Sequence, residues 1–233
     1  MSGLVVQTAK RILLPVAVLL LVMIGLGLIV TKSLAHTWPF SAEDGINRSF
    51  AGDRADPYNL VSWVFSFLGS TPWIIGVTAL VAIILRLTLH RWREPLFLCA
   101  GVTAQALVFF FTTLAIDRQR PTVGHLDSSP PTSSFPSGHT SAAVALYCGL
   151  AFLLASQARQ TWVKALCWAL VVLPVGVAVA RLYRGMHHPS DVTASFFNGI
   201  TCLVIMARSI LDRTVDWVVP DRFRSARRVK LAA

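Results

Sequence analysis

The hydrophobic positions of this chain gather in long runs that are separated by shorter polar segments. Six runs are each long enough to cross a bilayer, which takes about 20 helical residues. They fall near 12–31, 72–89, 96–116, 139–156, 164–181 and 191–211. We therefore predict an all-α fold, a polytopic membrane helical bundle of about six transmembrane helices, with residues 1–233 forming a single integral membrane domain.

The first run follows a basic pair of residues and has the position of a signal peptide. It is long enough to span a bilayer and no small-residue cleavage site follows it, so we expect an anchor. The last run is the least typical of the six, because it opens on Asp191 and contains Asn198 and Arg208.

Composition and charge narrow the class of protein. Charged residues make up 14% of the chain, against about 25% in a typical soluble domain. The net charge is +10, but with a cytoplasmic N-terminus fourteen of the 21 Lys and Arg residues fall in cytoplasmic segments, as the positive-inside rule requires. The basic tail, about 212–233, then lies against anionic lipid headgroups, and we expect no nucleic acid partner. The short loops favour a bacterial plasma membrane protein with both termini in the cytoplasm.

Three segments then reach the extracytoplasmic face: 33–71, 117–139 and 181–191. The first contains NLVSWVFSFLGS, which fits a short helix in the membrane interface or a re-entrant piece packed between spans. The other two hold four arginines, four of the six histidines and three aspartates. Because charged groups beside a bilayer are costly, this cluster is a candidate functional site. Each of the four cysteines lies inside a predicted span and reads as a buried, inert thiol.

The sequence PSGH at 136–139 precedes an apolar run and predicts the start of a helix. Ser137 or Gly138 is a suitable N-cap, which places His139 in the first turn. The free N–H groups and the positive end of the helix dipole make such a turn an anion-binding site.

A second histidine stands four residues before a carboxylate, in HHPSD at 187–191. Pro189 and Ser190 suit the start of the last span, with Ser190 as N-cap. Asp191 in the first turn can accept a hydrogen bond from His187. That bond fixes the imidazole tautomer and leaves the other ring nitrogen free as an acceptor or nucleophile.

Arginines accompany both histidines. Arg120 follows the third span, Arg181 closes the fifth, and Arg118 lies two residues before Arg120. Each guanidinium is a planar fork of donors suited to phosphate oxygens. Two histidines, a carboxylate and these arginines are the parts of an in-line phosphoryl transfer.

Three motifs therefore follow one another: Arg-Pro at 120–121, PSGH at 136–139 and R-x5-H-x3-D at 181–191. In order and spacing they resemble the three signature motifs of the type 2 phosphatidic acid phosphatase (PAP2) family, which shares its site with the vanadium haloperoxidases. The six predicted spans are similar to those of the family's membrane branch. The resemblance implies a PAP2/haloperoxidase-like core and a membrane-integral lipid phosphatase that needs no metal and no cofactor.

The same resemblance implies a role for each motif residue. His187 is the nucleophile that forms a phosphohistidine, His139 is the general acid and later the base, and Asp191 orients His187. The phosphoryl group is held by Arg120, Arg181, Ser137 and Gly138. The implied partner is a lipid phosphate or diphosphate in the bilayer, such as phosphatidate, phosphatidylglycerol phosphate or a polyprenyl diphosphate, hydrolysed at the outer face.

Two positions depart from the family pattern. The first motif begins with a lysine where this chain has Thr113, and the serine before the third-motif arginine is replaced by Ala180. A neutral threonine cannot supply the missing charge. We therefore add Arg118 to the candidate phosphate-binding residues, as a partial substitute for the lysine.

Alternatives remain open at this point. An anion or lipid-phosphate transporter would use the arginines for selectivity, although transporters usually place polar residues near the bilayer midplane. A catalytically silent, lipid-binding member of the fold is a second alternative, to which Thr113 lends some weight. A metal site at His125, His187, His188 and Asp191 is a third, which the neighbouring arginines disfavour. The sequence does not decide the substrate or the oligomeric state.

Overall fold

The computed structural model describes residues 2–128 and 131–212, and within them every regular element is a helix. The α-helices are α1 (Ser2–Thr8), α2 (Leu14–Leu28), α3 (Glu43–Gly52), α4 (Asp56–Leu68), α5 (Thr71–Leu89), α6 (Arg93–Ala115), α7 (Gly138–Ala143), α8 (Gly149–Gln157), α9 (Thr161–Trp168), α10 (Val172–Tyr183) and α11 (Pro189–Met206). Short π or 3₁₀ turns join several of them: η1 (Ala9–Leu13), η2 (Ile29–Ser33), η3 (Phe40–Ala42), η4 (Val144–Cys148), η5 (Ala169–Val171) and η6 (Ala207–Leu211).

The six predicted spans are confirmed, because these turns merge the shorter helices into six long ones. The long helices are Gly3–Ser33, Thr71–Leu89, Arg93–Ala115, Gly138–Gln157, Thr161–Tyr183 and Pro189–Leu211. Five of them begin and end within three residues of the prediction. The first starts nine residues earlier than predicted, because helix α1 continues through η1 into α2. The predicted tail lies, except for Asp212, outside the described residues.

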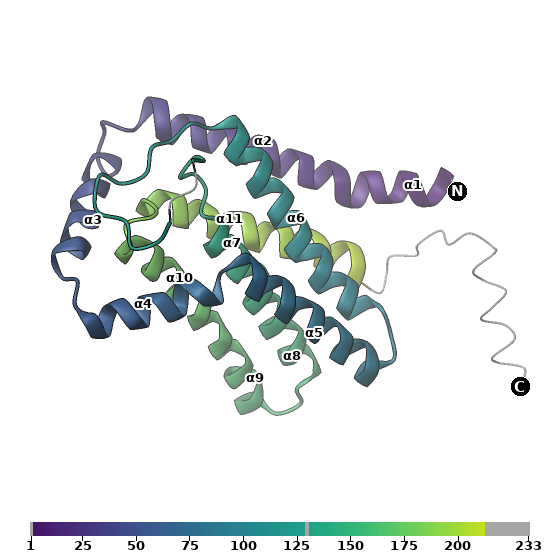
Figure 1. The fold of residues 1–233 in the computed structure, drawn as a ribbon. Coiled ribbons are helices and arrows are strands. Elements are labelled where there is room, and N and C mark those ends of the chain that lie inside the picture. The colour runs from purple at the N-terminus through teal and green to yellow at the C-terminus, as the bar shows by residue number, and fades with distance from the viewer. Residues whose placement is uncertain (1, 129–130, 213–233) are drawn as a thin grey trace, which may run out of the picture.

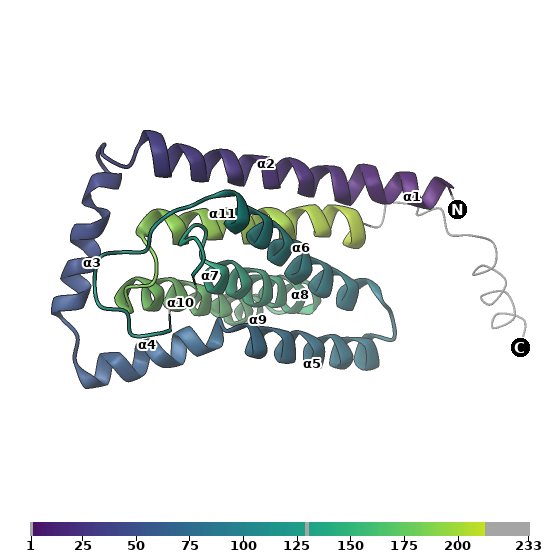
Figure 2. The same cartoon turned by 45° about the horizontal axis from the view of Figure 1, so that its top comes forward.

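The long helices run side by side, and the span formed by α7, η4 and α8 lies at the centre of the bundle (Figures 1 and 2). In this central span 61% of the most apolar stretch is buried, against 17–39% in the other five. Helix α6 packs against α2, α5, α7 and α11. The outer helices therefore keep apolar side chains for lipid, as a membrane bundle requires.

Helices α3 and α4 lie across one end of the bundle, where α3 crosses the left-hand ends of the long helices in Figure 2. Helix α4 packs along α10. Its apolar side chains, such as Leu60 and Trp63, are exposed, whereas Ser62 and Ser66 are buried against the bundle. The segment is a helix whose polar face points inward and whose apolar face is exposed.

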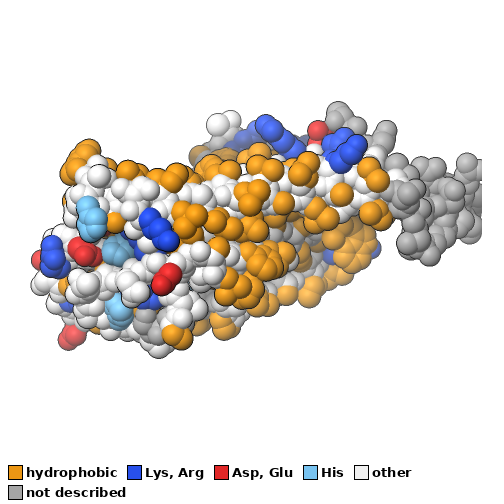
Figure 3. Space-filling view, turned by 90° about the horizontal axis from the view of Figure 1, so that it is seen from above, with side chains coloured by type: hydrophobic (Ala, Val, Ile, Leu, Met, Phe, Trp, Pro, Cys, Tyr) orange, Lys and Arg blue, Asp and Glu red, His pale blue; other side chains and the backbone are white. Residues whose placement is uncertain are grey.

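Charged and histidine side chains gather at the end that α3 covers, while orange apolar side chains cover the flanks (Figure 3). An apolar flank with a polar end is the surface expected of a bundle whose functional groups lie at one membrane face. The arrangement thus brings the two polar segments predicted to carry the site to one end of the fold.

Close packing beneath that end generates a stability prediction. A Cβ at Gly199 of α11 would lie 2.7 Å from Cγ1 of Val144 and 3.0 Å from the carbonyl oxygen of Ser141. Gly199→Ala should therefore destabilise the protein by about 1–3 kcal/mol, the usual cost of overpacking. Gly76→Ala is the matched control, because no atom lies within 4 Å of its Cβ position.

Thermal unfolding of both variants in detergent checks this expectation. The midpoint of Gly199→Ala should fall clearly below that of Gly76→Ala. Equal midpoints would mean that α11 does not approach η4 as closely as the structure has it.

Candidate functional site

A cavity of about 740 Å³ opens at the polar end of the bundle, with side chains of α4 in its lining. Its polar lining includes Arg120, Asp127, His139, Arg181 and His187. These residues come from the loop after α6, the first turn of α7, the last turn of α10 and the turn before α11. The structure therefore brings the three sequence motifs into one space.

The end of α10 turns the chain so that Arg181 and His187 share this space. Gly185 has φ of +72°, a left-handed conformation that suits glycine. The amide of Met186 donates to the carbonyl of Arg181, and that of Gly185 to the carbonyl of Leu182. This pair of bonds is a Schellman motif, which ends the helix and reverses the chain.

The tautomer of His187 is set by a backbone carbonyl rather than by a carboxylate. Nδ1 of His187 lies 2.7 Å from the carbonyl oxygen of Ser134, which can only accept. Nδ1 must therefore carry the hydrogen, and Nε2 holds the free lone pair. The nearest oxygen of Asp191 is 3.8 Å from Nδ1, so it acts on the ring through charge and not through a direct hydrogen bond.

The carboxylate of Asp191 is fully buried, with 0% of the residue exposed. Oδ1 is paired with the guanidinium of Arg118. Oδ2 accepts from the hydroxyl of Ser134 at 2.9 Å and from the amide of His188 at 2.8 Å. His188, not Ser190, is thus the N-cap of α11, so the predicted N-cap was wrong by two residues. The helix begins earlier because Asp191, at the third helical position, closes a capping box with His188.

Ser137 is the N-cap of α7, which confirms one of the two predicted candidates. Its hydroxyl oxygen accepts from the amide and the hydroxyl of Thr140, and the side chain is buried outside the cavity lining. Gly138 does line the cavity, and a Cβ there would lie 2.8 Å from the ring of Phe109. The first turn of α7 directs the amides of Gly138 and His139 out of the helix, toward any anion placed there.

Two arginines of the cavity keep donors available. Nη1 of Arg120 donates to the carbonyl of Met186 at 2.8 Å, and Nη1 of Arg181 donates to Asp127 at 2.6 Å. The Nε atoms of both side chains make no hydrogen bond to any described residue. Buried donors without partners are rare, and here they fit an anion that would occupy the cavity.

Asp127 is a cavity residue that the sequence analysis did not single out. It accepts from Arg181, from Ser66 of α4, and from both Nε and Nη2 of Arg184. Burial alone would raise the pKa of Asp127, but the bond from Arg184 and the charge of Arg181 hold it below its ordinary value. Arg184 is thereby buried in the protein and does not line the cavity.

Arg118 occupies a different place from Arg120 and Arg181. Its guanidinium contacts Asp191, Ser190 and Glu43, and it does not line the cavity. Thr113 lies in the last turn of α6, also outside the cavity lining. The charge that the first motif lacks at Thr113 is thus not supplied inside the cavity by Arg118.

The side chains considered for a metal site do not converge. No group of three or more His, Cys, Asp or Glu residues among residues 2–128 and 131–212 is arranged to hold a metal ion. His125 lies against the carbonyl of Pro121, and His188 against that of Gln119.

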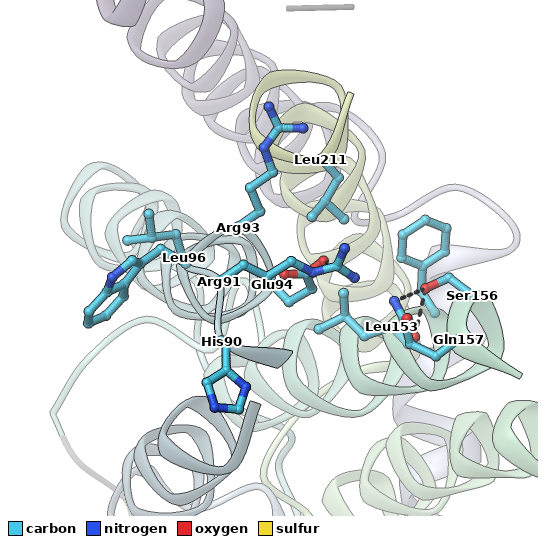
Figure 4. A pocket seen from close by; sticks show the side chains of 11 residues that line it. His90, Arg91, Arg93, Glu94, Leu96, Leu153, Ser156, Gln157 and Leu211 are labelled. Carbon is cyan, nitrogen blue, oxygen red and sulfur yellow. Dashed lines mark hydrogen bonds and ion pairs between the residues drawn. The ribbon is translucent and has the colours of Figure 1, made fainter. Parts of the chain in front are cut away.

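A second cavity, of about 780 Å³, lies at the opposite end of the bundle (Figure 4). Its charged lining is His90, Arg91, Arg93 and Glu94. It therefore lacks the pairing of two histidines with unpartnered arginine donors that marks the first cavity.

Comparisons with known proteins agree with this geometry. The family description "PAP2 superfamily" matches residues 16–214. The "Bacitracin transport permease protein BcrC" of Bacillus licheniformis is 26% identical over 156 residues, which cover 65% of this chain and 72% of that protein.

Two solved structures have the same fold. A transmembrane PAP2 type phosphatidylglycerolphosphate phosphatase from Bacillus subtilis matches with a TM-score of 0.73 and 21% identity, covering 88% of this chain and 98% of the other. LpxE of Aquifex aeolicus matches with a TM-score of 0.59 and 21% identity, covering 74% of this chain and 98% of the other. The membrane helices and the helix ends that form the cavity thus follow a known architecture.

The environment of His187 generates a prediction about its protonation. Burial and the charges of Arg181 and Arg120 outweigh the attraction of Asp191 and lower the pKa of His187 to about 4. Because the shift is downward, the ring is neutral at pH 7 and becomes charged only when the pH falls through about 4. Nitrogen NMR of the protein labelled with [¹⁵N]histidine should show Nδ1 protonated and Nε2 bare at neutral pH, with His187→Gln assigning the signal. A midpoint near the ordinary value of about 6.5 would contradict the buried geometry.

Proposed function

The chain belongs to the PAP2 superfamily, and from this premise we propose that it is a membrane phosphatase that hydrolyses a lipid phosphate or diphosphate through a phosphohistidine at His187. One observation carries the proposal. The cavity that holds His139, His187 and the arginines continues along apolar side chains of α4, α5 and α6, among them Trp63, Phe67, Ile74, Ile75, Phe109 and Phe110. A polar pocket joined to an apolar wall fits a phosphate headgroup with a hydrocarbon tail.

The first chemical step uses the two histidines together. Nε2 of His187 attacks phosphorus in line with the leaving oxygen, and the bond from phosphorus to that oxygen breaks. His139 donates a proton to the leaving oxygen, which departs as a lipid alcohol or, from a diphosphate, as a lipid monophosphate. Arg120, Arg181 and the amides at the start of α7 stabilise the equatorial oxygens.

The second step restores the enzyme. His139, now neutral, takes a proton from water as the water attacks the phosphohistidine. The phosphorus–nitrogen bond breaks, inorganic phosphate leaves, and both histidines return to their starting states. Because Nδ1 of His187 stays bonded to the carbonyl of Ser134, the same ring nitrogen is presented to phosphorus in every turnover.

The side of the membrane follows from the distribution of basic residues. With the N-terminus in the cytoplasm, most Lys and Arg residues fall in cytoplasmic segments. With six spans the C-terminus would also be cytoplasmic. The end of the bundle that holds the cavity would then face outward, which supports the outer leaflet as the site of action. The relatives named above come from bacteria, which supports a bacterial plasma membrane as the location.

A transporter is the second candidate function, and the Bacillus licheniformis relative, which is named as a transport permease, favours it. The location of the polar groups speaks for hydrolysis instead, since they lie at helix ends and not at broken helices near the bilayer midplane. A catalytically silent protein would not need the tautomer of His187 to be fixed or both histidines to line one cavity.

Phosphate release from a panel of substrates tests the proposal. Purified protein in detergent should release phosphate from at least one of phosphatidate, phosphatidylglycerol phosphate and a polyprenyl diphosphate, and far less from a soluble sugar phosphate. His187→Ala should lower the rate by about 10³-fold or more, as removal of a nucleophile does. EDTA should leave the rate unchanged.

Gly76→Ala is the matched control for handling and folding, because its Cβ position is open and lies outside the cavity lining. Absence of phosphate release from every lipid by the parent protein would reject the proposal and favour transport or lipid binding. Loss of activity with EDTA would reject the metal-free mechanism.

A further inference from the structure

The inner face of α3 touches the machinery of the site although α3 lies outside the three motifs. Glu43 and Asn47 are four residues apart, so they share one face of this helix. Glu43 is 6% exposed and Asn47 is fully buried. Nδ2 of Asn47 donates to the backbone carbonyl of His187 at 3.0 Å. One helix face thus contacts the segment that carries His187.

Glu43 reaches Asp191 through two routes. In the first, Oε2 of Glu43 accepts from Arg118 at 2.7 Å, and the other arm of the same guanidinium is paired with Asp191. In the second, Oε1 accepts from the amide of Ser190 at 2.7 Å and Oε2 from its hydroxyl at 3.0 Å. Ser190 is the neighbour of Asp191, so the first route ends at the Asp191 carboxylate and the second at the turn of α11 that carries it.

The charges of Arg118 and Asp191 explain why a carboxylate is needed at position 43. Asp191 alone could draw Arg118 fully onto itself and engage both of its oxygens. With Glu43 holding one arm, Arg118 reaches Asp191 through Nη1 alone. Oδ2 is left for Ser134 and His188, and it is the oxygen that faces His187. The negative end of Glu43 also complements the positive end of the α11 dipole.

We propose that Glu43 is a positioning residue for the proposed phosphatase, which through Arg118 and the first turn of α11 holds Asp191 in register with His187. Glu43 does not line the cavity and does not touch the substrate. Arg118 likewise acts on Asp191 rather than on the phosphoryl group. This role rests on the proposed function, and it gives α3 a part in catalysis.

Glu94 provides a matched control elsewhere in the chain. Its side chain is 9% exposed and pairs with Arg91 at 2.8 Å, while that of Glu43 is 8% exposed and pairs with Arg118 at 2.7 Å. Glu94 lies at the opposite end of the bundle, beside the second cavity. Glutamine at position 43 or 94 removes one buried negative charge in each case, but only Glu43 is connected to Asp191.

The experiment compares kcat, KM and the unfolding midpoint of Glu43→Gln, Glu94→Gln and the parent protein on the best lipid substrate. Glu43→Gln should lower kcat roughly 10- to 100-fold, by analogy with the outer-shell residues that orient metal-ligating histidines, with KM little changed. Glu94→Gln should keep the parent kcat. Glu43→Asp keeps the charge but shortens the reach, and should give an intermediate kcat.

A double-mutant cycle separates positioning from general stability. Arg118→Ala should lower kcat with little change in KM, whereas a phosphate ligand would raise KM as well. In the Arg118→Ala background, Glu43→Gln should add little further loss, because the connection to Asp191 is already broken.

Three outcomes would overturn the inference. One is a parent-like kcat in folded Glu43→Gln, or in Glu43→Asp where the glutamine variant does not fold. Another is a loss of kcat in both Glu43→Gln and Glu94→Gln, in proportion to the fall in each variant's unfolding midpoint. The third is an additive double-mutant cycle, in which Glu43→Gln lowers kcat by the same factor with and without Arg118→Ala. An inactive parent protein would instead refute the proposed function, and this role with it.

Discussion

The buried carboxylate of Asp191 is the group on which the polar end of the bundle depends. A charge with no exposed surface is tolerated only when it is paired and hydrogen-bonded, and Asp191 receives Arg118, the hydroxyl of Ser134 and the amide of His188. Arg118 and Ser134 come from the loop between α6 and α7, and His188 comes from the turn before α11. Satisfying one carboxylate therefore joins the loop after α6 to the start of α11, and through Arg118 and Glu43 it joins both to α3. The same contacts place the backbone carbonyl of Ser134 against His187.

The membrane accounts for the rest of the arrangement. The flanks of the bundle must be apolar and their backbone must be helical, so ionisable side chains collect where the helices end. Helix α4 follows the same constraint, because it turns Ser62 and Ser66 toward Arg184 and Arg181 and leaves its apolar face outside. A cavity at this boundary has charged groups at its base and apolar side chains along its wall. Membership of the PAP2 superfamily is consistent with that geometry and with the lipid phosphate proposed as its occupant.

The parts of this structure that follow from local patterns could be predicted from the sequence. Run length gives the six spans, and the N-cap preference gives Ser137 as one of two candidates for the start of α7. Contacts between distant segments could not be read in this way. The pairing of Glu43 with Arg118 joins residues 75 positions apart, and a lone glutamate after the first span carries no motif. The acceptor for His187 is a backbone carbonyl, which has no sequence signature, so the hydrogen bond expected from His187 to Asp191 is instead donated to the carbonyl of Ser134. Gly185 also carries a local signal, because a glycine just after a helix marks a reversal of the chain. That signal did not enter the prediction from the sequence.

The central claim is that Nε2 of His187 becomes phosphorylated during turnover. The most direct measurement is a rapid alkaline quench of the protein during hydrolysis of a ³²P-labelled lipid phosphate, followed by peptide mapping, because a phosphohistidine survives alkali and is lost in acid. We expect an acid-labile label on the peptide that contains His187, and none in His187→Ala. A label on another residue such as His139, or turnover without any labelled protein, would contradict it.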